Sequence, residues 1–420
     1  MLAAPICNET DMSNRAVKGN RLRGSIPKKW RDRAAFDVKV AGSLPNYSRV
    51  GYLNVLKRYP MNRPFLLFLS LCFSIAGFAQ EKTFPVDGVV LDSASGQRLN
   101  NASVFCQNTT FGTISKEDGR FHLRLPNGGY DLVVSYTGYE TQVLRIGKDH
   151  RPTDTLRIRM KEQDKSLEQA VVTGSAEVAD GWEKYGQFFL DNFIGTTPNA
   201  AKCSLDNQDV LKFYFYKKRN KLRVKATSPL IVTNNALGYK IIYQLDSFVY
   251  DYTGNISSYT GYPLFDTLSG TPEQQAVWKQ NRLYSYSGSR LHFIRSWYDS
   301  TLDYEGFVLE LADSATGKRM HRIQNPYDPK YYSRDSGDAE INIQGRLRVS
   351  YTSQTPERKY LIQNNFPLTT AVEISAIDIA GGGFVIEENG YFYDQADVTN
   401  IGYWSWKKLA EVLPYDYVPE

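Results

Sequence analysis

The chain of 420 residues is poor in cysteine and histidine, with four of each. No Cys-x-x-Cys pair is present, which excludes a zinc knuckle and a dithiol redox motif. Cys7 and Cys72 lie in segments that we expect the mature protein to lack. The remaining Cys106 and Cys203 allow one bridge or two buried free thiols, but no disulfide scaffold.

The histidines exclude a zinc peptidase of the carboxypeptidase type. Such an enzyme holds its metal with His and Glu close together in the sequence, plus a more distant third ligand. No histidine of this chain begins His-x-x-Glu or belongs to His-Glu-x-x-His. We therefore expect no metal site, and no motif calls for a cofactor.

Long hydrophobic stretches are also scarce, because only residues 65–79 form an apolar run of more than a dozen residues. This excludes a bundle of membrane-spanning helices. The run follows a short basic start at Met61 and ends in small residues at Gly77 and Ala79, as secretory signal peptides do. We predict a signal peptide at 61–79. The alternative is an uncleaved anchor, although the run is shorter than the roughly 20 residues that a spanning helix needs.

The positive charge of the chain is concentrated before this signal. Residues 1–60 contain 12 Lys and Arg but only four acidic residues. Because a signal peptide acts at the start of a nascent chain, we hypothesise that Met61 is the initiator and that 1–60 is a doubtful leader, not translated. Residues 80–420 hold 37 basic and 41 acidic residues, so the formal charge of +5 becomes about −4 in the mature chain. Nucleic acid is then not an expected partner, and no transmembrane segment is expected after cleavage.

Aromatic residues are abundant, with 29 Tyr, 21 Phe and 6 Trp, as in strand-rich proteins. In residues 80–160, short runs of β-branched and aromatic residues alternate with turn sequences such as Asp118-Gly119 and Asn127-Gly128. These dipeptides tolerate the positive φ of tight hairpins. Six or seven strands at about ten-residue spacing predict a small β-sandwich.

The same residues resemble the carboxypeptidase-regulatory-like domain family. The matching motifs follow one another in order: Gly88-Val-Val-Leu-Asp92, Gly96-Gln-Arg-Leu99, Asn101-Ala-Ser-Val104, Gly112-Thr-Ile-Ser115, Asp118-Gly-Arg-Phe121, Tyr130-Asp-Leu132 and Ser135-Tyr-Thr-Gly138-Tyr139. The resemblance implies a prealbumin-like sandwich without catalytic activity. In Gram-negative bacteria such domains often precede TonB-dependent outer-membrane receptors and other exported proteins.

A linker is expected at 161–178. Its residues 167–174, Leu-Glu-Gln-Ala-Val-Val-Thr-Gly, resemble the segment around the TonB-contacting box of those receptors. The remaining residues are too few for a receptor barrel of about 22 strands. The segment is therefore interpreted as an inherited linker, or as an extended strand that pairs with a partner's sheet edge.

Residues 179–420 predict a larger α+β domain with mostly antiparallel strands, of unknown function. Trp182, Tyr185, Phe189 and Phe193 lie on one face of an expected helix. Thr271-Pro272-Glu273-Gln274 has the pattern of a capped helix start. Further strands are expected at 341–351 and 391–394, among others, and a closing helix from 403 to 413.

One group of residues is a candidate for chemistry in this domain. Ser289, His292 and Glu305 combine a hydroxyl, an imidazole and a carboxylate, as a hydrolase requires. Helix capping by Ser289 and a structural role for His292 are the alternative, because neighbours on a helix point outward side by side. No nucleophile-elbow motif is present.

Two further groups are candidates for binding. Lys217, Lys218 and Arg219 lie in a run of basic residues across an expected hairpin, and they suit an anionic glycan or simply a solvated face. Tyr243 and Tyr259 have the side chains to stack on sugar rings or to pack across strands.

We therefore expect a mainly β, exported protein that is periplasmic or associated with the outer membrane. Its sandwich acts as a non-catalytic accessory module for an outer-membrane or periplasmic protein, or for an envelope glycan. The alternative is a periplasmic hydrolase with its site in residues 179–420.

Overall fold

The computed structural model describes residues 2–5, 83–147, 150–164, 177–313, 319–335 and 337–419. The predicted signal peptide and most of the predicted leader and linker lie outside these residues. Among the described residues, no helix is both long enough and apolar enough to cross a membrane.

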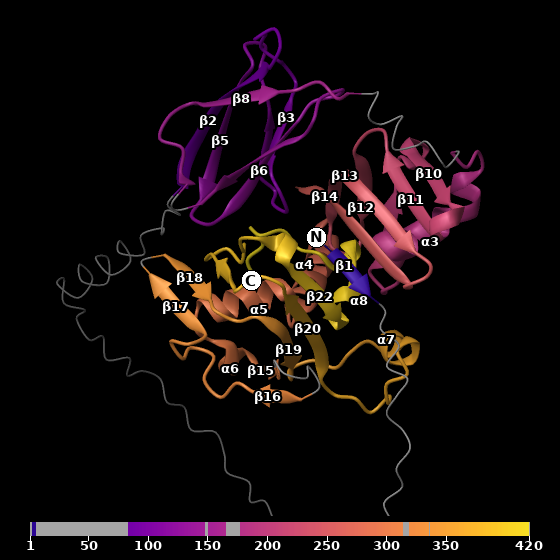
Figure 1. Ribbon diagram of the computed structural model, residues 1–420, viewed down its shortest axis with the longest axis vertical. Coiled ribbons are helices and arrows are strands. Elements are labelled where there is room, and N and C mark those ends of the chain that lie inside the picture. The colour runs from indigo at the N-terminus through magenta and orange to yellow at the C-terminus, as the bar shows by residue number, and fades with distance from the viewer. Residues whose placement is uncertain are drawn as a thin grey trace, which may run out of the picture. The chain divides into compact units, whose positions relative to one another are not determined.

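The first domain is a two-sheet β-sandwich (Figure 1). One sheet has the order β5-β2-β8, with strands Arg120–Pro126, Thr83–Asp92 and Leu156–Met160. The other has the order β4-β3-β6-β7, with strands Gly112–Ile114, Ser103–Cys106, Tyr130–Ser135 and Gln142–Ile146. Alternate side chains of β5 are buried, as expected where one sheet face covers a core. The predicted sandwich is confirmed.

The second domain begins with a twisted antiparallel sheet of seven strands that is covered by α3 (Gly181–Phe193). Its strands are β1 (Leu2–Pro5), β9 (Cys203–Leu205), β10 (Leu211–Tyr216), β11 (Lys221–Ala226), β12 (Leu230–Asn234), β13 (Tyr239–Asp251) and β14 (Ile256–Thr267). The predicted helix face is confirmed, because Phe189 and Phe193 are fully buried and Trp182 and Tyr185 pack beside them. Phe189 contacts Phe248 edge-on at a centroid distance of 4.9 Å.

A five-stranded antiparallel sheet and a three-stranded one complete this domain. The larger sheet has the order β16-β15-β19-β20-β22, with strands Met320–Arg322, Phe307–Ala312, Gly345–Tyr351, Glu373–Ile379 and Val398–Gly402. The smaller sheet has the order β17-β18-β21, with strands Tyr332–Asp335, Asp338–Ile341 and Phe384–Ile386. Phe293 and Trp297 of α5 (Arg290–Tyr298) are buried in the same core as residues of both sheets.

The remaining helices are short, apart from α4. They are α4 (Pro272–Tyr286), α6 (Leu302–Glu305), α7 (Arg358–Gln363) and α8 (Tyr403–Trp406), with 3-10 turns η2 (Ala200–Lys202), η3 (Gln208–Val210), η4 (Lys217–Arg219), η5 (Gln395–Asp397) and η6 (Leu409–Glu411). The predicted start of α4 is confirmed. The Thr271 hydroxyl accepts from the Gln274 amide, and the Gln274 side chain accepts from the Thr271 amide.

Three predicted elements need correction. The closing helix stops at Trp406 because Lys407 and Lys408 adopt extended backbone, and only the 3-10 turn η6 follows. The strand at 341–351 is two strands, since β18 ends at Ile341 and β19 begins at Gly345, whose φ is +90°. Residues 391–394 form one isolated bridge, between Phe392 and Ile386, instead of a strand.

Hydrogen bonds join the sandwich to the second domain. Asn108 donates its amide to Pro263 and accepts from the amide of Tyr415, each at 2.7 Å. The side chain of Asn389 bonds both the amide and the carbonyl of Gly129. We call this set of contacts, together with those of Thr110, Asp131 and Arg145, the seam.

Candidate functional site

The structure brings two of the three hydrolase candidates into contact. The imidazole of His292 lies 3.1 Å from Glu305, measured from Nε2 to Oε2. Its other nitrogen, Nδ1, accepts a hydrogen bond from the amide of Gly288 at 3.1 Å. Because an amide can only donate, Nδ1 is unprotonated and Nε2 carries the proton that Glu305 accepts.

Ser289 does not join this pair as a nucleophile. It is the N-cap of α5, and its hydroxyl accepts from the backbone amide of His292. A serine hydrolase needs an imidazole nitrogen open to the serine hydroxyl, yet Gly288 and Glu305 occupy both nitrogens of His292. Burial lowers the pKa of His292, and Glu305 opposes this shift. The imidazole therefore has the setting of a buried structural histidine.

The basic candidates lie on the surface, at the turn of the expected hairpin. Lys217, Lys218 and Arg219 form η4 between β10 and β11, and Asn220 closes the turn with a φ of +49°. All three basic side chains are exposed. This placement leaves them accessible to solvent and to an anionic ligand alike.

The two tyrosine candidates lie in the core, which corrects their interpretation as a sugar platform. Tyr243 and Tyr259 are 4% and 2% exposed. Both pack edge-on against Phe193 of α3, at centroid distances of 4.9 and 5.1 Å. Neither ring has a face open to a ligand, because α3 covers this side of the sheet.

A buried charged cluster in the second domain escaped the sequence analysis. Glu373 begins β20, is 2% exposed, and neither of its carboxylate oxygens has a hydrogen-bond partner within the described part of the chain. Burial raises its pKa to about 7, which Lys407 opposes and Glu357 reinforces. Lys407 is 9% exposed, and its ammonium lies over the Tyr403 ring at 4.7 Å. No sequence motif indicates this cluster, because its members lie far apart in the sequence.

A small cavity of about 90 Å³ lies next to this cluster. Ser289, Asn400, Lys407, Lys408 and Glu411 are among its lining residues. Glu411 is held in place, since its carboxylate accepts from Ser285 at 2.7 Å and from Asn199 at 3.0 Å. Burial lowers the pKa of Lys408 to about 8. Apolar residues, among them Leu291, Val412 and Leu413, also line this cavity.

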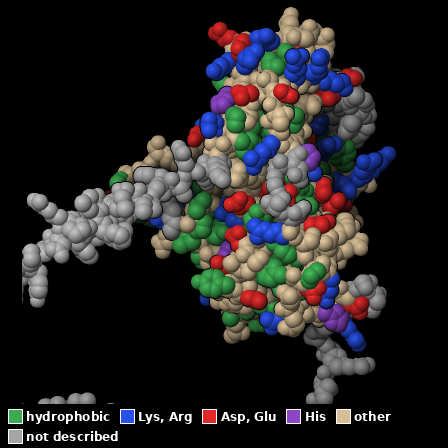
Figure 2. Space-filling view, turned by 90° about the vertical axis from the view of Figure 1, so that its left-hand side faces the viewer, with side chains coloured by type: hydrophobic (Ala, Val, Ile, Leu, Met, Phe, Trp, Pro, Cys, Tyr) green, Lys and Arg blue, Asp and Glu red, His purple; other side chains and the backbone are tan. Residues whose placement is uncertain are grey.

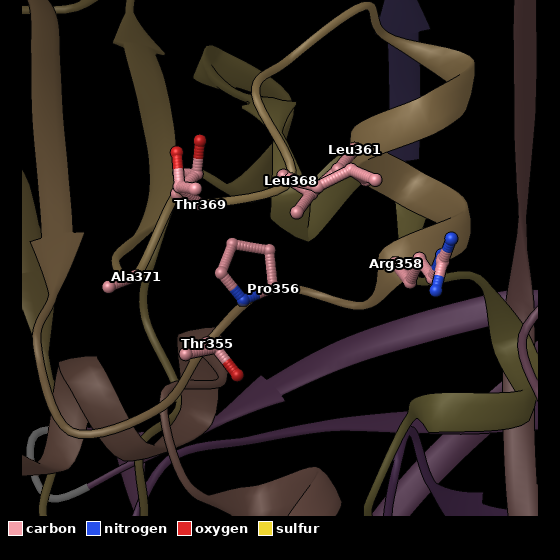
Figure 3. A pocket seen from close by; sticks show the side chains of 8 residues that line it. Thr355, Pro356, Arg358, Leu361, Leu368, Thr369 and Ala371 are labelled. Carbon is pink, nitrogen blue, oxygen red and sulfur yellow. The ribbon is translucent and has the colours of Figure 1, made fainter.

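A larger hollow of about 290 Å³ opens on the surface in the connection from β19 to β20, which contains α7 (Figure 3). It is lined by Thr355, Pro356, Arg358, Leu361, Leu368, Thr369, Thr370 and Ala371. We call it the 355–371 groove. Sequence reasoning missed it, because neither α7 nor the loop beside it carries a motif.

The two cysteines in the described part of the chain form no bridge. Cys106 and Cys203 are unbridged, and burial raises the pKa of Cys203 to about 12. Acidic and basic side chains are interspersed over the face drawn in Figure 2. In the described ranges, no three His, Cys, Asp or Glu side chains are grouped so that they could hold a metal ion.

Comparison with known proteins identifies the class of the first domain. Residues 86–172 match the family of the CarboxypepD_reg-like domain. The matched region contains all seven strands of the sandwich except the first residues of β2. The predicted carboxypeptidase-regulatory-like domain is thus confirmed.

Two curated proteins with similar sequences are receptors. The TonB-dependent receptor SusC of Bacteroides thetaiotaomicron is 33% identical over 113 residues, which cover 27% of this chain and 10% of the receptor. The TonB-dependent receptor P3 of Formosa agariphila is 31% identical over 100 residues, covering 24% of this chain and 9% of the receptor. The chain therefore spans about a tenth of the length of these relatives.

Among solved structures, a DUF3823 family protein from Parabacteroides merdae covers 47% of this chain and 87% of its own length. Its sequence identity is 10% and its TM-score is 0.16, too low to support a conclusion.

Proposed function

We propose that this chain is a non-enzymatic protein of the bacterial cell envelope, whose sandwich binds a protein or glycan partner as an accessory module. The observation that carries the proposal is the CarboxypepD_reg-like domain at 86–172, which resembles part of two TonB-dependent receptors. The predicted signal peptide at 61–79 supports export. We place the mature protein in the periplasm or at the outer membrane.

The sandwich has a surface on which a partner can bind. Ile114 of β4 and Val143 of β7 are 58% and 42% exposed, on strands of the same four-stranded sheet. These strands are the two edges of that sheet, so the two positions report on a partner at either edge. The seam uses other residues of the sandwich, so these two positions remain accessible.

Photo-crosslinking in intact cells tests this proposal. A photoreactive amino acid replaces Ile114 or Val143, and a matched control replaces Val277 of α4, which is 50% exposed in the second domain. We expect a discrete adduct in the envelope fraction from the two sandwich positions and none from Val277. A soluble protein without adducts contradicts the proposal.

A hydrolase assay tests the non-enzymatic part. Ser289→Ala and Thr271→Ala each remove one N-cap hydroxyl, at a cost of about 1 kcal/mol of stability. We expect the two variants to behave alike toward ester, peptide and glycoside substrates. Hydrolysis by the wild-type protein that Ser289→Ala abolishes and Thr271→Ala preserves would overturn this view.

A further inference from the structure

The 355–371 groove combines an apolar floor with an accessible positive charge. Pro356 and Leu361 are buried and form its base, whereas Thr355, Arg358 and Leu368 are exposed along its rim. In Figure 3 Arg358 lies on α7, and Leu368 and Thr369 lie on the segment that follows the helix. The groove therefore has two walls from one continuous stretch of chain.

Exposed apolar side chains are frequent in the chain segment that forms the groove. Ile362, Phe366, Leu368 and Ile374 are 58%, 44%, 55% and 40% exposed. They fall within thirteen consecutive residues, so they are not the scattered single apolar residues that any protein surface shows. Exposed apolar side chains are what a contact site needs.

Aromatic packing holds the groove in shape before any ligand binds. Tyr360 packs edge-on against Tyr403 of α8 at 4.9 Å, and Trp406 donates to the Gln363 side chain at 2.7 Å. Lys359 donates to the carbonyl of Thr196 at 2.7 Å. A preformed site avoids the ordering cost that a mobile loop pays on binding.

The accessible charge of the groove is positive. Residues 352–372 contain two basic residues, Arg358 and Lys359, and one acid, Glu357. Glu357 is half-buried, and burial together with Glu411 raises its pKa. Lys359 is engaged with Thr196, whereas no described residue bonds or pairs with the guanidinium of Arg358. An exposed guanidinium beside an apolar hollow is complementary to a carboxylate next to an apolar side chain.

We propose that the 355–371 groove binds an extended peptide segment of a partner protein. An apolar side chain of the peptide enters the hollow over Pro356 and Leu361, and an adjacent carboxylate bonds Arg358. Thr355 and Thr369 line the same hollow and carry hydroxyls that can bond the peptide backbone. This site lies in the second domain and is independent of the sandwich surface proposed above.

Fluorescence anisotropy with two labelled peptides tests the assignment. The probes are Gly-Ser-Leu-Phe-Asp-Gly and the same peptide with Asn in place of Asp, both with blocked ends, titrated with the full chain. We expect the acidic peptide to bind about tenfold more tightly, because its carboxylate makes a charge-assisted hydrogen bond to Arg358 that the neutral amide cannot make. The preference should weaken as salt is added.

Matched variants locate the binding. Arg358→Gln should abolish the preference for Asp, and Lys218→Gln, which removes an exposed charge of the basic hairpin, should preserve it. Leu368→Ser should lower the affinity for both peptides about tenfold. Val277→Ser, at another exposed apolar position, should leave both affinities unchanged.

Four results would overturn the proposal. The first two are equal affinity for the two peptides and no binding of either peptide at millimolar concentration. The others are an equal effect of Arg358→Gln and Lys218→Gln on the preference for Asp, and evidence that another ligand occupies the groove. Dimerisation that Leu368→Ser disrupts would assign the groove to a second copy of the chain. Sedimentation with phosphatidylglycerol vesicles that Phe366→Ser abolishes would assign it to a membrane surface.

Discussion

At the scale of single residues, environment decides what the polar side chains do. His292 resembles a catalytic base by type and spacing, but the Gly288 amide occupies the nitrogen that a nucleophile requires. Glu373 lacks any sequence signal, yet burial raises the pKa of its carboxyl group to about 7, near neutrality. Burial and hydrogen bonding are tertiary properties, so neither outcome was predictable from residue types.

The raised pKa of Glu373 predicts a pH-dependent stability. The ordinary value is near 4.5 and the folded value is about 7, so the folded state holds the proton more tightly and loses stability as pH rises between these values. Glu373→Gln removes the titration. The variant should therefore gain stability relative to the wild type from pH 5 to pH 8, by about 3 kcal/mol at most.

Urea unfolding at several pH values measures this effect, with Glu388→Gln as the control at an exposed position. A pH-independent difference between Glu373→Gln and the wild type would show that Glu373 is charged throughout.

At the scale of elements, sequence patterns predicted the features that depend on interactions between residues close together in the sequence. The α4 capping box, the turn at 217–220 and the α3 face follow from neighbouring residues alone. The break between β18 and β19 coincides with Gly345, whose φ is +90°, and with the pairing of Ile341 beside Gly383, which has a φ of +152°. The short end of α8 likewise depends on the burial of Lys407. The sequence carries no local signal for either contact.

The close approach at Gly383 predicts a strong difference between adjacent glycines. A Cβ on Gly383 would lie 2.1 Å from the carbonyl oxygen of Ile341, whereas a Cβ on Gly382 meets nothing within 4 Å. Gly383→Ala should lower the free energy of unfolding by about 2 kcal/mol or more, and Gly382→Ala by less than about 0.5 kcal/mol. Thermal unfolding of both variants checks this, and equal effects would show that the backbone relaxes.

At the scale of the whole molecule, the seam joins two domains that the sequence presents as separate. Tyr391 donates to Asp131 at 2.9 Å, and Arg145 lies 3.3 Å from Asp394. Burial raises the pKa of Asp131, and the Tyr391 hydroxyl opposes this shift. Domain order and fold class were predictable from strand and turn patterns. The seam was not, because its partners are about 150 to 310 residues apart.

The seam predicts that the sandwich and the second domain unfold together. Scanning calorimetry of the wild type should show one transition. The double variant Asn389→Ala, Tyr391→Phe removes three hydrogen bonds across the seam and should produce a separate transition for the sandwich. Tyr393→Phe removes a bond to Glu387 within the second domain and should preserve the single transition. Two transitions in the wild type would contradict the prediction.

The distance along the chain between the seam partners also constrains the order of folding. Asp416 accepts from the backbone amide and the hydroxyl of Thr110, at 2.9 and 2.5 Å, across a separation of 306 residues. The sandwich contains its own core and can close as soon as residue 160 has been synthesised. The hydrogen bonds between Thr110 and Asp416 can form only after nearly all of the remaining chain has been synthesised. Until then, the sandwich surface at Asn108 and Thr110 stays uncovered and open to chaperones.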